Sequence, residues 1–304
     1  MSPSESAPAR VTVPDIQGRK PSASGGAPLV MITAYDVVSA RLADRAGADV
    51  LLVGDSLGMV VLGRENTLSV TMEEMVHHAR AVAAARPRAL VVGDMPFLSY
   101  HLSTPEAVRN AGRLLTDGGC QAIKVEGGRR IRRTIEALLD AEIPVMGHLG
   151  LTPQSVHAMG GFRVQAKQAD AAEALVGEAV LLAEAGVFAL VLEGIPTEVA
   201  RLVTAAVPIP TIGIGAGPHC DGQVLVWHDL VGLTEGPVPK FVRRYADIGK
   251  EIVEALSGFV RDVHSGTFPA DEESYHLPAR EAERLRARIN SPESDQNPPE
   301  GVER

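Results

Sequence analysis

Four acidic residues each end or follow a short apolar run, and their placement is the strongest sign of chemistry in this chain. They are Asp55, Asp94, Glu126 and Glu193. Each apolar run is typical of a fully buried strand. The carboxyl ends of parallel strands open onto one face of an α/β fold, so we expect these carboxylates to gather there. Carboxylates gathered in that way can bind a divalent metal ion or move protons.

Asp55, Asp94 and Glu126 form a candidate metal site. Their hard oxygen atoms suit Mg²⁺, which keeps several waters and takes few carboxylates. Zinc is disfavoured because no HExxH motif or paired histidine motif accompanies them. Each acid alone could instead cap a helix or pair with an arginine. Three acids at equivalent strand ends are harder to explain in that way, since they would repel one another without a cation.

Lys124 and Ser56 adjoin these acids in the sequence. Lys124 precedes Glu126 by two residues, so both side chains leave the strand on the same side. Because an unpaired buried ammonium is unfavourable, we expect Lys124 to pair with the carboxylates and to act in the site. Ser56 directly follows Asp55, and its hydroxyl and backbone N–H could hold a substrate carboxylate. The same hydroxyl could equally cap a helix.

Glu193 and His148 stand at the ends of later strands. A carboxylate in a dry pocket can act as a general base, and we expect this role for Glu193. A fourth metal-site carboxylate and a helix cap before Pro196 are the alternatives for the same residue. His148 is flanked by glycines one and two residues away, and it could hydrogen-bond a substrate or be purely structural.

The elements that would position these residues alternate along the chain. Helical patterns separate the apolar runs, with a capping box at Thr71–Glu74 and glycine stops at Gly47 and Gly186. The unit of helix, glycine, buried strand and terminal acid repeats, which predicts a (β/α)8 TIM barrel. A doubly wound open sheet is the alternative, and the absence of GxGxxG after the first strand counts against it. The eight candidate strands are residues 29–34, 50–54, 90–93, 122–125, 144–147, 189–192, 210–214 and 223–227.

Length and composition limit the number of domains and the classes of partner. The 304 residues suit one large domain, which we expect at residues 27–277. Residues 1–26 are expected to be mostly flexible, and residues 278–304 to form a charged helix and a disordered tail. The net charge of −9 disfavours nucleic acid or an anionic membrane as a partner. No signal peptide or membrane span is evident, and the two cysteines lie in no metal motif, which favours the cytoplasm.

Seven spaced segments of the chain, within about residues 11–275, together resemble the ketopantoate hydroxymethyltransferase family. Each segment alone is unspecific, whereas the spaced set is highly specific. Related barrels of the phosphoenolpyruvate mutase and isocitrate lyase superfamily share the style of metal site but are not expected to carry all of these segments. The segments are MITAYD (31–36), VGDSLG (53–58), GDMP (93–96), KVEG (124–127), GHLGLTPQ (147–154), LEG (192–194) and IGIGAG (212–217).

The resemblance implies a reaction and its cofactors. A one-carbon unit from 5,10-methylenetetrahydrofolate is added to 3-methyl-2-oxobutanoate, which gives 2-dehydropantoate on the route to pantothenate and coenzyme A. The resemblance also implies that Mg²⁺ is the metal and that the protein is a homo-oligomer, often a decamer in bacterial members. The unmatched residues at both ends of the chain leave the contacts between subunits open.

The resemblance implies roles for named residues as well. Glu193 matches the proton acceptor of the family. Asp55, Asp94 and Glu126 would hold Mg²⁺, directly or through water. Residues implied to contact the keto acid are Asp55, Ser56, Asp94 and Lys124, with supporting roles for Tyr35 and His148.

The chemistry expected from the residues agrees with that reaction. An aliphatic C–H beside a ketone is too weak an acid for a carboxylate to deprotonate unaided, and Mg²⁺ chelated by the keto oxygen and carboxylate would stabilise the enolate. A Mg²⁺-dependent lyase or aldolase on small 2-oxo acids is the first alternative, and it would need no folate. A barrel that binds small molecules without chemistry is the second, and the presence of both Lys124 and Glu193 argues against it.

Overall fold

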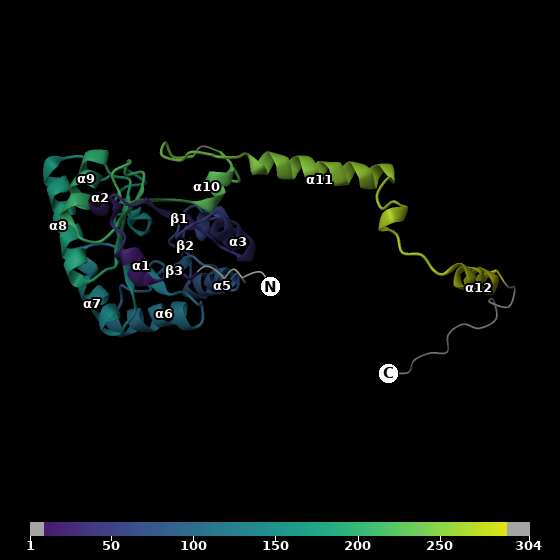
Figure 1. The fold of residues 1–304 in the computed structure, drawn as a ribbon, viewed down its shortest axis with the longest axis horizontal. Helices are drawn as coiled ribbons and strands as arrows, with labels where there is room; N and C mark the ends of the chain where they lie inside the picture. The colour runs from purple at the N-terminus through teal and green to yellow at the C-terminus, as the bar shows by residue number, and fades with distance from the viewer. Residues whose placement is uncertain (1–8, 237, 291–304) are drawn as a thin grey trace, which may run out of the picture. The chain divides into compact units, whose positions relative to one another are not determined.

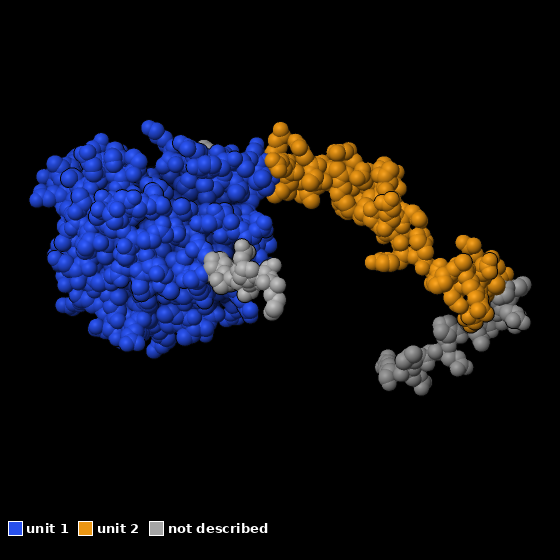
Figure 2. Space-filling view, in the orientation of Figure 1, with its two compact units in different colours: residues 1–248 blue, residues 249–304 orange. Residues whose placement is uncertain are grey.

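The computed structural model describes residues 9–236 and 238–290. The predictions of flexibility in residues 1–8 and of disorder in residues 291–304 lie outside the described residues. Contacts divide the chain into two units, residues 1–248 and residues 249–304, which carry different colours in Figure 2. The barrel boundaries expected at residues 27 and 277 rest on composition and remain a prediction.

Eight parallel strands in the first unit close into a barrel (Figure 1). Each strand pairs with the next one along the chain, and β8 pairs with β1. This closure confirms the predicted (β/α)8 TIM barrel and rules out the open sheet. The strands are β1 Leu29–Thr33, β2 Val50–Val53, β3 Leu90–Asp94, β4 Ala122–Glu126, β5 Val145–Gly150, β6 Ala189–Glu193, β7 Thr211–Ile214 and β8 Gly222–Leu225.

The sequence prediction was wrong at the end of the eighth strand. That strand was expected to reach Trp227, but β8 ends at Leu225 and Trp227 begins a helix. The backbone N–H of Trp227 donates a hydrogen bond to Thr33 Oγ1 at 2.9 Å, so it turns away from the strand ladder.

The longer helices of the first unit form the outer layer of the barrel (Figure 1). The Thr71 side chain accepts from the backbone N–H of Glu74 in the predicted capping box. Gly47 and Gly186 have φ values of +95° and +104°, which favour glycine where α3 and α8 end. The helices are α1 Val13–Gln17, α2 Pro21–Ser24, α3 Val37–Arg45, α4 Leu57–Val60, α5 Met72–Ala83, α6 Thr104–Thr116, α7 Arg132–Asp140, α8 Ala169–Ala185, α9 Thr197–Ala206 and α10 Trp227–Val231, with 3₁₀ turns η1 Arg129–Ile131 and η2 Pro153–Ser155.

Successive strand residues point alternately to two apolar layers, one outside the barrel and one inside it. Outward positions pack against the helices, whereas inward positions fill the barrel. The inward set includes Leu90 and Val92 of β3, Ala122 of β4, Met146 of β5, and Ala189 and Val191 of β6. The period of two therefore turns the next inward positions toward the carboxyl end of the barrel, and these are Asp94, Lys124, His148 and Glu193.

The segment before β1 packs against the opposite end of the barrel. Ile16 of α1 is fully buried in the cluster that fills the barrel interior. Lys20 Nζ lies 2.7 Å from Asp221 Oδ2, and Asp221 also accepts from the backbone N–H groups of Ser22 and Thr211, both at 2.9 Å. Asp221 thus joins the N-terminal segment to the start of β7.

We expect Asp221→Asn to lower the free energy of unfolding by about 3 kcal/mol at neutral pH, because a buried ion pair that loses one partner leaves the other uncompensated. Burial raises the pKa of Asp221, but hydrogen bonds from Lys20 and Ser22 outweigh it and hold the pKa below its ordinary value of 3.8. The negative charge of Asp221 therefore stabilises the fold fully at pH values above the ordinary pKa of 3.8. This stabilisation is lost as the pH falls through the lowered pKa.

Urea titrations of the native protein and of Asp221→Asn should show that their difference in free energy of unfolding becomes smaller as the pH is lowered from neutral to about 3. Glu283→Gln, at an exposed position, is the control and should change stability little at either pH. A difference between Asp221→Asn and the native protein that does not change with pH would contradict the prediction.

The second unit consists of helices with little burial. It contains α11 Ile248–Ser265, which begins at the boundary, then η3 Asp271–Glu273 and α12 Ala279–Ile289. The structure records no buried residue in α11 or α12. Across residues 9–236 and 238–290, no helix has the length and apolar character needed to cross a membrane.

Candidate functional site

Strand register brings the predicted charged residues together. Asp94 of β3 lies opposite Lys124 of β4, and Glu126 of β4 lies opposite His148 of β5. Because these strands are parallel and pair in order, the inward side chains form one ring at the carboxyl end of the barrel. Asp55 follows the end of β2, the strand beside β3, and its side chain joins the same ring.

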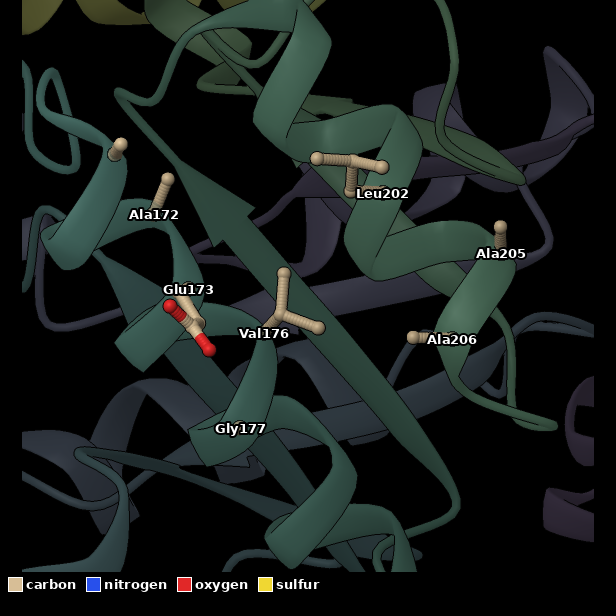
Figure 3. A pocket seen from close by; sticks show the side chains of 8 residues that line it. Ala172, Glu173, Val176, Gly177, Leu202, Ala205 and Ala206 are labelled. Atoms are coloured by element: carbon tan, nitrogen blue, oxygen red, sulfur yellow. The ribbon is translucent and has the colours of Figure 1, made fainter.

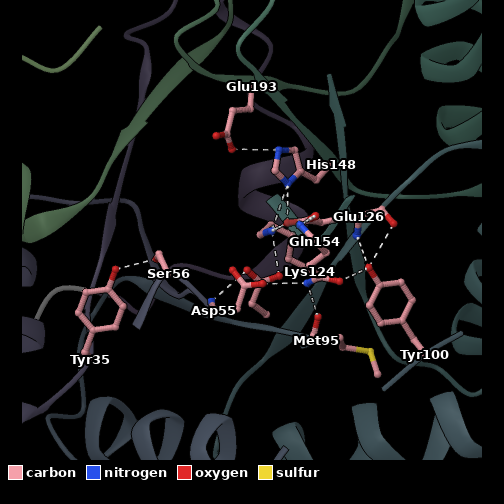
Figure 4. Close-up of polar contacts among 11 residues, drawn as sticks. Tyr35, Asp55, Ser56, Met95, Tyr100, Lys124, Glu126, His148, Gln154 and Glu193 are labelled. Carbon is pink, nitrogen blue, oxygen red and sulfur yellow. Dashed lines mark hydrogen bonds and ion pairs between the residues drawn. The ribbon is translucent and has the colours of Figure 1, made fainter. Parts of the chain in front are cut away.

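A buried ammonium lies among the carboxylates (Figure 4). Lys124 Nζ is 2.8 Å from Asp94 Oδ1 and 3.7 Å from Glu126 Oε1. The backbone N–H of Asp55 donates to Asp94 Oδ2 at 3.3 Å. All four residues are at most 4% exposed. The structure therefore brings together the three predicted metal ligands and the predicted lysine.

The negative charge of this cluster exceeds what Lys124 compensates. Burial raises the pKa of the Asp55 carboxyl well above its ordinary value, and the charges of Asp94 and Glu126 raise it further. Burial alone would lower the pKa of Lys124, but the same carboxylates outweigh that effect and raise it, so the side chain stays charged. A site with this charge pattern favours an added cation.

The residues present fit a magnesium ion by chemistry. Asp94 Oδ1 is buried and contacts the Lys124 ammonium, Glu126 Oε1 is buried and accepts no hydrogen bond, and both are hard oxygen donors. Among the described residues, no three carboxylate, imidazole or thiol groups already converge as a coordination shell. The Lys124 ammonium approaches two of the carboxylates instead. Since Mg²⁺ usually keeps several waters, it does not require that all three carboxylates converge.

His148 connects the cluster to Glu193 (Figure 4). Its Nδ1 lies 3.2 Å from Lys124 Nζ and 3.5 Å from Glu126 Oε1, while its Nε2 lies 3.3 Å from Glu193 Oε2. Burial and Lys124 lower the pKa of the imidazole, but Glu126 and Glu193 outweigh them and raise it to about 9.

The orientation of His148 does not depend on its charge. A protonated ring carries hydrogen on both nitrogens, and a neutral ring that accepts from Lys124 at Nδ1 carries it on Nε2. In either state, Nε2 carries a hydrogen and lies 3.3 Å from Glu193 Oε2, a charge contact rather than an aligned hydrogen bond. The side chain of Glu193 is 16% exposed, against 2% for those of Asp94 and Glu126, which leaves it at the open edge of the cluster.

Ser56 and Tyr35 form a separate pair beside the acids. Their hydroxyl oxygens lie 2.8 Å apart, and Tyr35 is 2% exposed. The Ser56 side chain makes no capping hydrogen bond to α4, although it stands at the N-cap position. The Ser56 hydroxyl is thus not engaged in the capping role that was its structural alternative.

Two residues that sequence reasoning did not select also belong to the cluster. Gln154, in η2 after β5, contacts Asp55 and Glu126, and Tyr100, after β3, contacts Gln154 and Glu126. Gln154 closes the segment GHLGLTPQ, so its place in a family-like segment was an available signal. The sequence around Tyr100 offers no comparable signal.

A surface groove lies away from this cluster. It encloses about 760 Å³ between α8 and α9 and has an apolar lining of small side chains, with Glu173 at one side (Figure 3). None of the predicted site residues lines it.

Comparison with known proteins decides the family. The family model described as ketopantoate hydroxymethyltransferase matches residues 10–271. The chain belongs to the ketopantoate hydroxymethyltransferase family. This confirms the resemblance carried by the seven segments and places the chain among one-carbon transferases.

Curated relatives of the ketopantoate hydroxymethyltransferase family extend over almost the whole chain. A protein of Moorella thermoacetica named 3-methyl-2-oxobutanoate hydroxymethyltransferase is 56% identical over 88% of this chain and 98% of its own length. A protein of Syntrophomonas wolfei with the same name is 53% identical over 91% of this chain and 99% of its own length.

Solved structures support the fold at low sequence identity. A 2,3-dimethylmalate lyase of the PEP mutase/isocitrate lyase superfamily aligns with a TM-score of 0.55 and 17% identity, over 96% of this chain and all of that one. A phosphoenolpyruvate phosphomutase from Streptomyces platensis aligns with a TM-score of 0.55 and 17% identity, over 91% of this chain and 96% of its own. At this identity the likeness establishes a shared barrel and nothing about the reaction.

Proposed function

We propose that this protein transfers a hydroxymethyl group from 5,10-methylenetetrahydrofolate to 3-methyl-2-oxobutanoate, forming 2-dehydropantoate for pantothenate synthesis. The observation that carries the proposal is the buried cluster of Asp55, Asp94, Glu126 and Lys124, with Glu193 at its open edge, in a chain of the ketopantoate hydroxymethyltransferase family. The names of relatives that are more than half identical support the same substrate.

Magnesium fits this proposal as the metal. Asp55, Asp94 and Glu126 would hold Mg²⁺, directly or through water, as their burial and excess negative charge suggest. When bound, Mg²⁺ would supply positive charge that stabilises the negative charge developing on the keto oxygen.

The remaining roles fall to groups of the chain itself. The Lys124 ammonium and the Ser56 hydroxyl would bind the oxygens of the keto acid, and Tyr35 would hold Ser56 through their hydroxyl contact of 2.8 Å. The Glu193 carboxylate would remove the proton from C3 of the keto acid, as a positioned general base. His148 would hold Glu193 in place through Nε2, at 3.3 Å.

In the proposed steps, water adds to the methylene carbon of the folate, both bonds from that carbon to the folate nitrogens break, and tetrahydrofolate and formaldehyde are formed. The C3–H bond of the keto acid breaks, its proton goes to Glu193, and the electron pair forms a new bond from C3 to the formaldehyde carbon. The formaldehyde oxygen then takes up a proton and becomes the hydroxyl of the hydroxymethyl group, so one water is consumed overall.

Proton exchange tests this function. The protein is incubated with 3-methyl-2-oxobutanoate in D₂O, with Mg²⁺ or with EDTA, and the C3 proton is followed by NMR. Methylenetetrahydrofolate is then added and 2-dehydropantoate is sought. Metal-dependent exchange followed by product is the expected result. Exchange without product would favour a lyase or aldolase on 2-oxo acids, and the absence of both would overturn the proposal.

We also propose a homo-oligomer, in line with the decamers implied by the family resemblance. The support comes from α11, whose apolar side chains repeat at helical spacing and are 44–62% exposed. A stripe of this kind is typical of a helix that packs against another surface. The stripe comprises Ile252, Val253, Leu256, Phe259, Val260 and Val263.

We expect Leu256→Glu to lower the assembled mass in sedimentation velocity, because it places a charge in the middle of the stripe. Arg261→Glu, on the polar side of the same helix, is the matched control and should leave the mass unchanged. An unchanged mass for Leu256→Glu would show that the stripe takes no part in assembly.

The cytoplasm is the location we propose. Both cysteines, Cys120 and Cys220, are free and buried, as is ordinary for a protein kept in a reducing compartment.

A further inference from the structure

One glutamine residue joins the ends of three neighbouring strands. Gln154, which is 5% exposed, donates from Nε2 to Asp55 Oδ2 after β2 and to the carbonyl oxygen of Met95 after β3, both at 2.9 Å. Its backbone N–H donates to Glu126 Oε2 at the end of β4, at 3.0 Å. Gln154 therefore holds two carboxylates of the cluster, each through one of its two oxygens (Figure 4).

The partners fix which way the Gln154 amide points. Both groups near Nε2 are acceptors, so a flipped amide would set its own oxygen against a carboxylate and a carbonyl. Gln154 Oε1 must then accept, and it lies 2.7 Å from the hydroxyl of Tyr100. That hydroxyl accepts from the backbone N–H of Glu126 at 3.1 Å, and its single proton goes to Gln154 rather than to the carbonyl oxygen of Glu126, which lies farther away at 3.2 Å.

The hydrogen bonds form a directed chain that ends on a carboxylate. It runs from the N–H of Glu126 through Tyr100 and Gln154 to Asp55. Each bond fixes the donor of the next, so the orientation of Asp55 depends on Tyr100, which does not touch it. Glu126 Oε1, the oxygen that Gln154 leaves alone, is buried and accepts no hydrogen bond.

We propose that Gln154 and Tyr100 are positioning residues, which hold Asp55 and Glu126 so that their remaining oxygens receive a divalent cation. The inference rests on the proposed function, because it takes these carboxylates as metal ligands. Residues that orient metal ligands commonly affect metal affinity by about 10- to 100-fold when they are replaced.

Metal binding without catalysis tests the inference. Free Mn²⁺, as a probe for the Mg²⁺ site, is measured by its EPR signal in titrations of the full-length protein without folate. Gln154→Met keeps the length of the side chain and removes its donors, and we expect Mn²⁺ affinity to fall by about 10-fold or more. Tyr100→Phe, the milder change, should lower it by a smaller factor.

Thr204→Val is the matched control for the loss of a buried hydrogen bond. The hydroxyls of Thr204 and Thr211 lie 2.8 Å apart and are buried, in the Asp221 network near the start of β7 rather than in the cluster. We expect this variant to lower the melting temperature but to leave Mn²⁺ affinity within about twofold, since distant sites act independently.

The outcomes separate this inference from the proposed function. Native affinity in both Gln154→Met and Tyr100→Phe, with tight Mn²⁺ binding by the native protein, would overturn the positioning role and leave the function standing. A native protein that binds no Mn²⁺ would overturn the metal site itself and the inference with it. If Thr204→Val weakened Mn²⁺ binding as much as Gln154→Met, the effect would be one of general stability, and the positioning role would be wrong.

Discussion

Glu193→Gln should lower turnover by about 100-fold or more while the keto acid and Mg²⁺ still bind, because loss of a positioned general base removes that much rate. The amide keeps the size of the side chain and can still lie against His148 Nε2, which is 3.3 Å from the carboxylate. What it loses is the ability to take the C3 proton. Metal-dependent exchange of that proton in D₂O should therefore fall with turnover.

Binding measurements decide between the roles left open for Glu193. Isothermal titration with 3-methyl-2-oxobutanoate in Mg²⁺ should give a dissociation constant within about twofold of the native value, since a base acts in the transition state. Glu198→Gln, the same change at an exposed position on α9, is the control and should leave turnover intact. If binding fell in proportion to turnover, Glu193 would belong to the ligand shell.

Lys124→Met should be the most destabilising change at the site. The ammonium is 3% exposed and faces the carboxylates of Asp94 and Glu126 at 2.8 and 3.7 Å. Removal of one partner from a buried ion pair costs about 3–5 kcal/mol, because the other charges stay buried without compensation. We expect that loss in urea unfolding without metal, together with weaker binding of the keto acid.

Magnesium should distinguish electrostatic loss from a packing defect in Lys124→Met. A cation bound only by the folded state stabilises it, and the variant has more negative charge to neutralise. Mg²⁺ should therefore raise the stability of the variant by more than that of the native protein. Lys250→Met, which removes an exposed lysine 3.8 Å from Glu254, should lower stability by about 1 kcal/mol at most. If Mg²⁺ raised the free energy of unfolding of Lys124→Met and of the native protein equally, this account would be contradicted.

The sequence predicted the barrel and most of the charged cluster for a specific physical reason. Buried parallel strands are continuous apolar runs, so an acid that ends such a run marks its carboxyl end directly. The inward direction of Lys124 and Glu126 followed from the period of two along one strand. The shared family segments then added the reaction, which spacing alone could not supply.

What the sequence could not supply is register between strands and the conformation of loops. His148 lies between Glu126 and Glu193 because β5 pairs with β4 and β6 at particular residues, and one sequence does not reveal that offset. Gln154 reaches three strand ends through a short 3₁₀ turn, which leaves no periodic pattern. Tyr100 is buried although it lies in a loop after a strand, where no apolar period marks it as inward-facing.

The pairing of β8 with β1 has a consequence for synthesis of the chain. The two strands lie near opposite ends of the barrel sequence, and contacts so far apart form slowly and late. Until β8 has emerged from the ribosome, β1 keeps an open edge, which exposes the nascent chain to association with others. A chain released before β8 would carry Asp94, Lys124, Glu126 and Glu193 in full, yet it would lack the closing strand that completes the ring around them.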